Sequence, residues 1–376
     1  MAAKDVKRGA TKAAREATAT ASLDDIAETI YKHLKSANIP EVQLSSRNKS
    51  NIVLDERSRV WKYGREMTTR SAKSLDGAYM LLRTMFLTDF IKQMVGENKS
   101  STLREMYYIS EGWDLAKFHS QDESDMLAED LEVMTGSMRE DFKLRPEENG
   151  AAMMGNLSIV ETTRNGEKRT MHCQDDVGDA GYNIPYNVEP DRLSFKDVET
   201  DFVIAIETGG MFARLVENGF DTKHNCTLVH LKGQPARSTR RLIKRLNEEA
   251  KQPIVVFTDG DPWSFRIFAS VAYGAIKTAH LSEHLATPSA QFLGVTPSDI
   301  INYELPNDDL SEEDVKALQA ILEDPRFDDD YWRGEVNLQL EMKKKSEQQA
   351  LAKYGLNFVT DRYLPEKLTE MGILTK

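Results

Sequence analysis

Two short apolar runs constrain the fold of this chain more than any other feature. Residues 202–206 and 254–257 consist only of Phe, Val, Ile and Ala. Such runs are typical of strands that are buried on both faces, as in parallel sheets. A helical pattern follows each run, at 210–217 and at 263–273, and a further one lies at 238–246. This alternation predicts an α/β domain with a parallel sheet.

The preceding part of the chain predicts a separate, helical domain. One amphipathic helix is expected over 75–95 and another over 124–134, each followed by a Gly that favours a helix end. Between them, Thr102 and Glu105 have capping-box spacing and predict the start of a third helix. Short helices with tight connections are typical of a helix-turn-helix or winged-helix module. We therefore expect an α+β multidomain chain with a winged-helix domain at 71–148 and an α/β domain at 149–376.

The first 70 residues contain fewer signals. Residues 1–21 are rich in Ala, Thr and Lys without a sustained apolar period, which predicts an arm. Ser22 is a plausible N-cap for a helix that ends at the Asn-Ile-Pro sequence of 38–40. We therefore treat 1–70 as an N-terminal arm and helix.

The amino-acid composition indicates the cellular compartment of the protein. Two Cys in 376 residues cannot form a disulfide scaffold, which favours a reducing environment. The chain contains no run of 18 apolar residues, and its basic N-terminus lacks the apolar core of a signal peptide. We expect a cytoplasmic protein with no membrane partner.

Basic residues cluster twice although the formal net charge is −12. One cluster extends from Arg57 to Lys73, and the other, which has no acid, extends from Lys232 to Arg245. Each cluster alone is most simply a solvated helical face, but two on an acidic chain favour a surface that contacts DNA phosphates. The candidate DNA-binding residues are Arg57, Arg59, Arg70, Lys232, Arg237, Arg240 and Arg241.

Acidic residues follow the two apolar runs. Glu207 comes directly after the first run, and Asp259 and Asp261 follow the second. In an open parallel sheet, ligands bind outside the carboxyl ends of the strands, and carboxylate oxygens suit Mg²⁺. The alternative is that these acids cap helices, since Asp is a favoured N-cap residue.

The third predicted helix carries adjacent tyrosines. Successive helical residues point about 100° apart, so Tyr107 and Tyr108 lie on different faces. Tyr107 shares the apolar side with Leu103, whereas Tyr108 is one turn from Arg104. A guanidinium beside a phenol suits a tyrosine nucleophile that attacks a phosphodiester. The simpler interpretation is that both tyrosines are packing residues.

Together these motifs resemble a known family. The Glu and Asp-x-Asp arrangement resembles a Toprim domain, and residues 104–108 resemble the CAP-like winged helix of topoisomerase VI A subunits and the related meiotic double-strand-break transesterases. The sequence departs from the family at Ser264, which follows Trp263 where an aromatic residue followed by Gly is commoner. Further similar segments are 232–241, 258–262, 294–300 and 353–356.

The resemblance implies the roles of individual residues. Tyr108 matches the nucleophile and Arg104 the arginine one turn before it, while Glu207, Asp259 and Asp261 match the Mg²⁺ ligands. Each strand of double-stranded DNA would be cut through a 5′-phosphotyrosyl intermediate, so that a duplex can pass and supercoils relax.

The resemblance also implies an assembly. The A subunit would form a homodimer within an A2B2 heterotetramer, with residues 1–70 contacting a partner subunit. In the family ATP is bound by a separate ATPase B subunit, which agrees with the lack of a Walker A loop in this sequence. The protein would be associated with the nucleoid.

Three alternatives remain open. The chain could initiate recombination as a transesterase that does not reseal DNA. It could be a non-enzymatic winged-helix protein that binds DNA, or a Toprim metallonuclease that forms no tyrosine link.

Overall fold

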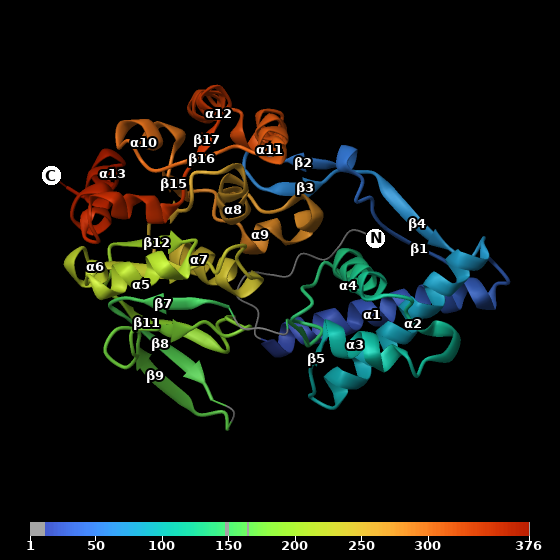
Figure 1. Ribbon diagram of the computed structural model, residues 1–376. Helices are drawn as coiled ribbons and strands as arrows, with labels where there is room; N and C mark the ends of the chain where they lie inside the picture. Colours follow the sequence, from blue (N-terminus) through green and yellow to red (C-terminus); the bar gives the residue numbers. More distant parts are fainter. Residues whose placement is uncertain (1–11, 147–149, 164, 376) are drawn as a thin grey trace.

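The computed structural model describes residues 12–146, 150–163 and 165–375. A helical domain, an arm made of strand pairs, a small antiparallel sheet and a large α/β domain make up the chain (Figure 1). Among these residues, no helix is long and apolar enough to cross a membrane.

The helical domain has one core, to which the N-terminal helix contributes. Leu23 and Ile30 of the N-terminal helix pack in the same cluster as Leu87 and Leu131. Two short parallel strands close the domain. Its elements are α1 (Lys12–Lys35), α2 (Leu75–Gly96), β5 (Ser101–Thr102), α3 (Leu103–Ser110), α4 (Gln121–Thr135) and β6 (Leu144–Arg145).

The start of α1 corrects the expected arm. The helix already begins at Lys12, well before Ser22. Thr18 and Thr20 donate their hydroxyls to carbonyls one turn earlier, which lets both residues stay inside the helix. Ala19 is buried, so this part of the helix contributes to the core of the domain. Residues 1–11 of the expected arm lie outside the described residues.

Two antiparallel strand pairs connect the domains (Figure 1). We call this segment, residues 41–71, the arm; it is distinct from the arm that was expected at residues 1–21. One pair contacts α1, α2 and α4, whereas the other packs against the α/β domain. There, Ile52 and Trp61 form a cluster with Ala279, and the Trp61 amide donates to the Tyr273 carbonyl. The arm consists of β1 (Glu41–Ser45), β2 (Ile52–Leu54), β3 (Trp61–Tyr63) and β4 (Met67–Ser71).

The expected parallel strands form the centre of a six-stranded sheet. Strand β12 (Phe202–Ile206) pairs in parallel with β13 (Cys226–His230) and with β14 (Ile254–Phe257), which in turn pairs with β15 (Gln291–Gly294). The sheet is mixed, because two further strands extend it in antiparallel orientation. These are β7 (Ala152–Met154) and β10 (Tyr182–Asn183).

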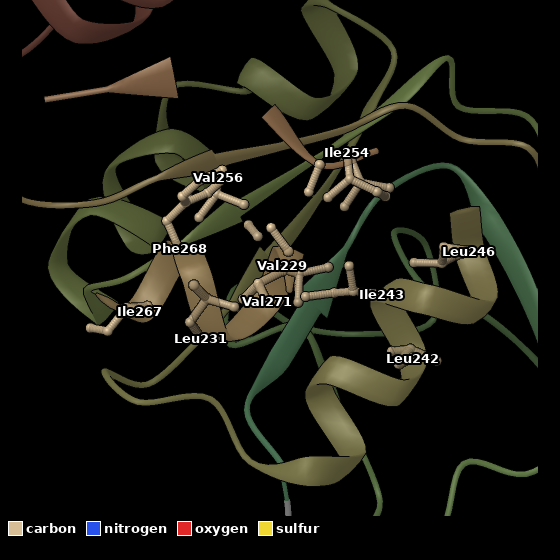
Figure 2. Close-up of a cluster of buried hydrophobic side chains, with 14 of the residues drawn as sticks. Val229, Leu231, Leu242, Ile243, Leu246, Ile254, Val256, Ile267, Phe268 and Val271 are labelled. Carbon is tan, nitrogen blue, oxygen red and sulfur yellow. The ribbon is translucent and has the colours of Figure 1, made fainter. Parts of the chain in front are cut away.

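Both faces of this sheet are buried, as the apolar runs predicted. Along β12, Val203 belongs to one core and Ile204 to the other. On the first face, Ile243 of α7 and Val271 of α8 meet Val229 of β13 (Figure 2). The helices of the α/β domain are α5 (Gly209–Glu217), α6 (Phe220–Lys223), α7 (Arg237–Glu249), α8 (Pro262–Ala272), α9 (Ser282–Leu285), α10 (Pro297–Asn302), α11 (Glu312–Leu322), α12 (Asp330–Met342) and α13 (Leu364–Glu370).

A separate antiparallel sheet precedes β12 and was not distinguished in the sequence. It consists of β8 (Leu157–Thr162), β9 (Lys168–His172) and β11 (Leu193–Val198). Each of its strands contains partly or fully exposed residues, so these strands lack the continuous apolar runs of the main sheet.

The remaining elements are short. An antiparallel pair, β16 (Asp308–Asp309) and β17 (Lys344–Lys345), flanks α11 and α12. The 3₁₀ segments are η1 (Lys49–Asn51), η2 (Asp114–Ala116), η3 (Ile276–Leu281), η4 (Pro325–Phe327) and η5 (Gln348–Tyr354), and the π-helical segment η6 (Val359–Tyr363) precedes α13.

Candidate active site

The tyrosine-bearing helix α3 is anchored at its start. The Glu105 amide donates to the Thr102 hydroxyl at 3.0 Å, and the Thr102 amide donates to the Glu105 carboxylate at 2.7 Å, which confirms the capping box. Tyr107 is half-buried against the core of the helical domain, whereas Tyr108 is 60% exposed. The two tyrosines therefore occupy the faces that helical spacing predicted, and Tyr108 is the more exposed of the two.

A cavity of about 460 Å³ lies beside Tyr108. Arg104 lines it from the preceding turn of α3. Residues of α4 and of the end of β6 line the opposite side of the cavity, so the cavity is formed by segments that are distant in sequence. The lining residues are Leu103, Arg104, Tyr107, Tyr108, Gln121, Asp125, Arg145 and Pro146.

The three candidate metal ligands are each held through one carboxylate oxygen. Glu207 Oε2 accepts from the Asp259 amide at 3.1 Å and from the Ser264 hydroxyl at 2.7 Å. Asp261 Oδ1 accepts from the Ser264 amide at 2.7 Å, and Asp259 Oδ1 accepts from the Gln348 amide at 2.8 Å. The second oxygen of each carboxylate makes no hydrogen bond within the described residues, so three oxygens remain for a ligand.

The electrostatics of these acids suit a cation. Burial raises the pKa of Glu207, and Asp261 raises it further. Burial, together with the charges of Glu207 and Asp261, raises the pKa of Asp259 to about 7. Carboxylates in this situation repel one another until a positive ion neutralises them.

The donor set fits Mg²⁺, which takes a few carboxylate oxygens and keeps several waters. In the part of the chain that the structure describes, however, no three acidic, His or Cys side chains converge closely enough to enclose a metal ion. The carboxylates therefore form an open edge and not a closed cage.

The two aspartates lie beyond the end of strand β14. Strand β14 ends at Phe257, so the alternation of a strand does not place Asp259 and Asp261 on one side. Asp261 is the N-cap of α8, as the alternative interpretation predicted, but it uses only one oxygen for this. The Ser264 hydroxyl donates a hydrogen bond to the Glu207 carboxylate. No sequence pattern predicted this contact.

The first basic cluster, Arg57–Lys73, lies on the arm. Arg57 and Arg59 lie between β2 and β3, with Arg59 close to the Tyr273 ring. Arg57 and Arg59 are both exposed. Arg70 is half-buried, and its guanidinium lies 2.9 Å from the Asp130 carboxylate. DNA contact by Arg57 and Arg59 stays a prediction, supported by their access to solvent and by the absence of a carboxylate partner within the described residues.

The second basic cluster, Lys232–Arg245, is not the open basic face that its sequence suggested. The Arg237 guanidinium donates to the Glu132 carboxylate, and the Arg241 guanidinium donates to the Glu189 carboxylate. Arg240 is only 8% exposed, and burial followed by the charge of Arg237 lowers its pKa to about 10. Packing of this amphipathic helix draws the arginines against protein, which the run of positive charge could not reveal. Lys232 remains exposed.

Comparisons with known proteins match three consecutive segments of the chain. Residues 202–368 match the model of the Toprim domain of the topoisomerase 6 A subunit/Spo11 group. Residues 147–199 match the all-beta domain in the DNA topoisomerase VI alpha chain. Residues 79–144 match the type IIB DNA topoisomerase model. The expected α+β multidomain fold class with an α/β Toprim domain is confirmed, whereas the winged-helix character of the first domain stays a prediction.

Curated relatives match over nearly the whole chain. A protein of Archaeoglobus fulgidus, named as the A subunit of type 2 DNA topoisomerase 6, is 60% identical over 353 residues, which cover 94% of this chain and 97% of the relative. Proteins of the same name from Methanosarcina mazei and Halobacterium salinarum are both 57% identical and cover 96% and 93% of this chain, and 97% and 95% of the relatives. The chain therefore belongs to the family of topoisomerase VI A subunits, the DNA-cleaving components of type IIB DNA topoisomerases.

Proposed function

We propose that this chain cuts double-stranded DNA with Tyr108 as the nucleophile. The observation that carries the proposal is the exposed phenol of Tyr108 at a cavity that Arg104 also lines, on a helix fixed by its capping box. The names of the relatives, which specify a DNA topoisomerase, agree with a phosphodiester as the substrate.

The reaction exchanges one phosphoester bond for another. The Tyr108 oxygen would form a bond to the backbone phosphorus while the bond to the 3′ oxygen breaks, leaving a 5′-phosphotyrosyl link. The phenol loses its proton and the leaving 3′ oxygen gains one. Reversal of the same exchange reseals the strand without ATP, because the covalent link conserves the ester.

Glu207, Asp259 and Asp261 would hold Mg²⁺ through the oxygens that make no hydrogen bond within the described residues. Bound there, Mg²⁺ would supply neutralisation of phosphate charge. The contribution of this chain is to fix the carboxylates, since the Asp259, Ser264 and Gln348 amides and the Ser264 hydroxyl hold their other oxygens.

The active assembly is proposed to contain more than this chain. The relatives are named as A subunits, which favours partnership with a B subunit, and the sequence lacks a Walker A loop for ATP. We propose an A2B2 heterotetramer built on a homodimer of this chain, in which ATP hydrolysis by B drives duplex passage and supercoil relaxation near the nucleoid. Residues 1–70 are proposed to contact a partner subunit.

The test is detection of covalent protein–DNA complexes in the presence of Mg²⁺ and the reconstituted B subunit. We expect complexes with protein on the 5′ ends, dependent on Mg²⁺ and absent in Tyr108→Phe. Product ends with free 5′ phosphates would identify a metallonuclease, and binding without cleavage would identify a non-enzymatic DNA-binding protein. Covalent complexes that never reseal would identify the recombination-type transesterase.

A further inference from the structure

The cavity beside Tyr108 contains a second arginine, Arg145, that the sequence motifs did not include. Strand β6 pairs in parallel with β5, and this pairing sets Arg145 opposite Thr102, the N-cap residue of α3. Arg145 is therefore fixed at the first turn of the helix that carries Tyr108. Arg145 is half-buried and lines the same cavity as Arg104.

Both cavity arginines have open guanidinium groups. Within the described residues, neither Arg104 nor Arg145 makes a side-chain hydrogen bond or ion pair, whereas Arg237 and Arg241 each contact a carboxylate through two nitrogens. Arg104 is exposed and Arg145 is half-buried, so the donors of both guanidinium groups are available to a ligand. A ligand with several acceptor oxygens would satisfy both groups.

The acids near this cavity are already engaged by the protein. Glu105 accepts from the Thr102 amide in the capping box, and that hydrogen bond, more than the nearby charge of Arg145, lowers the pKa of Glu105. Asp125 accepts from the Gln121 side chain at 2.6 Å. Gln121 is also the first residue of the 15-residue helix α4, so this helix begins at the cavity.

We propose that Arg145 binds a phosphate of the cleaved DNA strand, so that two guanidinium groups, of Arg104 and Arg145, hold the phosphate beside Tyr108. The proposal rests on the proposed role of Tyr108. Guanidinium forks match phosphate oxygens in bidentate geometry. Positive groups placed before the reaction also stabilise the charge that develops on a phosphate during transfer.

The variants that test this are Arg145→Ala and Arg145→Lys, measured in the reconstituted complex with Mg²⁺. We expect Arg145→Ala to slow covalent complex formation by about 10²-fold, the scale for losing one preorganised donor. Arg145→Lys should be intermediate, since it keeps the charge but not the fork. Added guanidinium ion should partly restore Arg145→Ala and leave Tyr108→Phe inactive.

Two control variants separate phosphate binding from other causes. Arg169→Ala removes an exposed arginine on β9, and it should cleave like wild type. Glu105→Gln keeps a capping acceptor but removes the charge next to Arg145, and it should also cleave nearly normally. Thermal unfolding of Arg145→Ala should match wild type.

The outcomes distinguish this inference from the proposed function. Wild-type cleavage by Arg145→Ala would overturn the role of Arg145 and leave that of Tyr108 intact. Lost cleavage that guanidinium does not restore, together with a lowered unfolding temperature or an equal loss in Glu105→Gln, would make Arg145 a structural residue. A wild-type complex that never links to DNA would refute the proposed function, and the inference with it.

Discussion

Glu132 of α4 and Arg237 of α7 form a two-point ion pair, with N–O distances of 2.7 and 3.1 Å, between the helical domain and the α/β domain. The Glu132 side chain is completely buried and also contacts the Arg139 guanidinium at 3.1 Å and the His280 ring at 3.4 Å. One carboxylate on the domain with Tyr108 thus contacts three basic groups, two of them from the domain with the candidate metal ligands.

This ion pair predicts a large loss of stability when one partner is removed. Arg237→Ala should destabilise the protein by about 3–5 kcal/mol, because it leaves a buried carboxylate less compensated. Denaturant unfolding measures the loss. The matched control is Arg214→Ala, which breaks a more exposed pair with Glu217 and should cost about 1 kcal/mol or less. Equal losses in the two variants would contradict the interdomain role.

The same carboxylate predicts an acid-dependent stability. Burial alone would raise the pKa of Glu132, but Arg237 and Arg139 outweigh burial and hold it well below its ordinary value of 4.5. A carboxyl with a lowered folded pKa stabilises the protein above its unfolded pKa, and this contribution is lost as the pH falls below about 4.5. The stability difference between wild type and Glu132→Gln should therefore shrink on acidification. A constant difference would refute the ionised state of Glu132.

The exposure of the adjacent tyrosines predicts opposite outcomes for two similar variants. Tyr108→Phe should abolish covalent complex formation without changing DNA affinity or unfolding temperature, because the side chain is exposed and only the phenol oxygen is removed. Tyr107→Phe should keep substantial cleavage, because its ring packs against the core. Gel detection of covalent complexes measures both. An inactive Tyr107→Phe beside an active Tyr108→Phe would reverse the assignment.

The carboxylate edge predicts that stability and activity respond differently to Asp261→Asn. Asn still caps α8, and the substitution removes a charge that repels Glu207 and Asp259, so the metal-free protein should unfold at the same or a higher temperature. Mg²⁺-dependent cleavage should fall by about 10²-fold or more. Thermal unfolding with and without Mg²⁺ should show a smaller shift for the variant. Lower metal-free stability with full cleavage would make Asp261 only a helix cap.

The two basic clusters predict separable effects. Arg57→Glu with Arg59→Glu should weaken DNA binding on all sequences and reduce its salt dependence, because both side chains reach solvent. Arg241→Glu should mainly destabilise the protein, because it would face Glu189. Binding titrations over a salt series and unfolding measurements compare them. An unchanged salt slope in the arm variant would remove Arg57 and Arg59 from the DNA surface.

The sequence alone determined those structural features that depend on residues close together in the chain. The apolar run 202–206 required a strand buried on both faces, and β12 is such a strand. Thr102 and Glu105 fixed the start of α3, and helical spacing then separated the environments of Tyr107 and Tyr108. Capping and periodicity depend on neighbours within one or two turns, so they can be read without the fold.

Tertiary structure decided the contacts between residues far apart in the chain. Arg237 lies 105 positions from Glu132, and only folding placed its guanidinium on that buried carboxylate. Folding likewise brought the Ser264 hydroxyl to Glu207 and set Arg145 beside the helix of Tyr108. Such partners follow from the packing of whole elements, which leaves no periodic trace in the sequence around either residue.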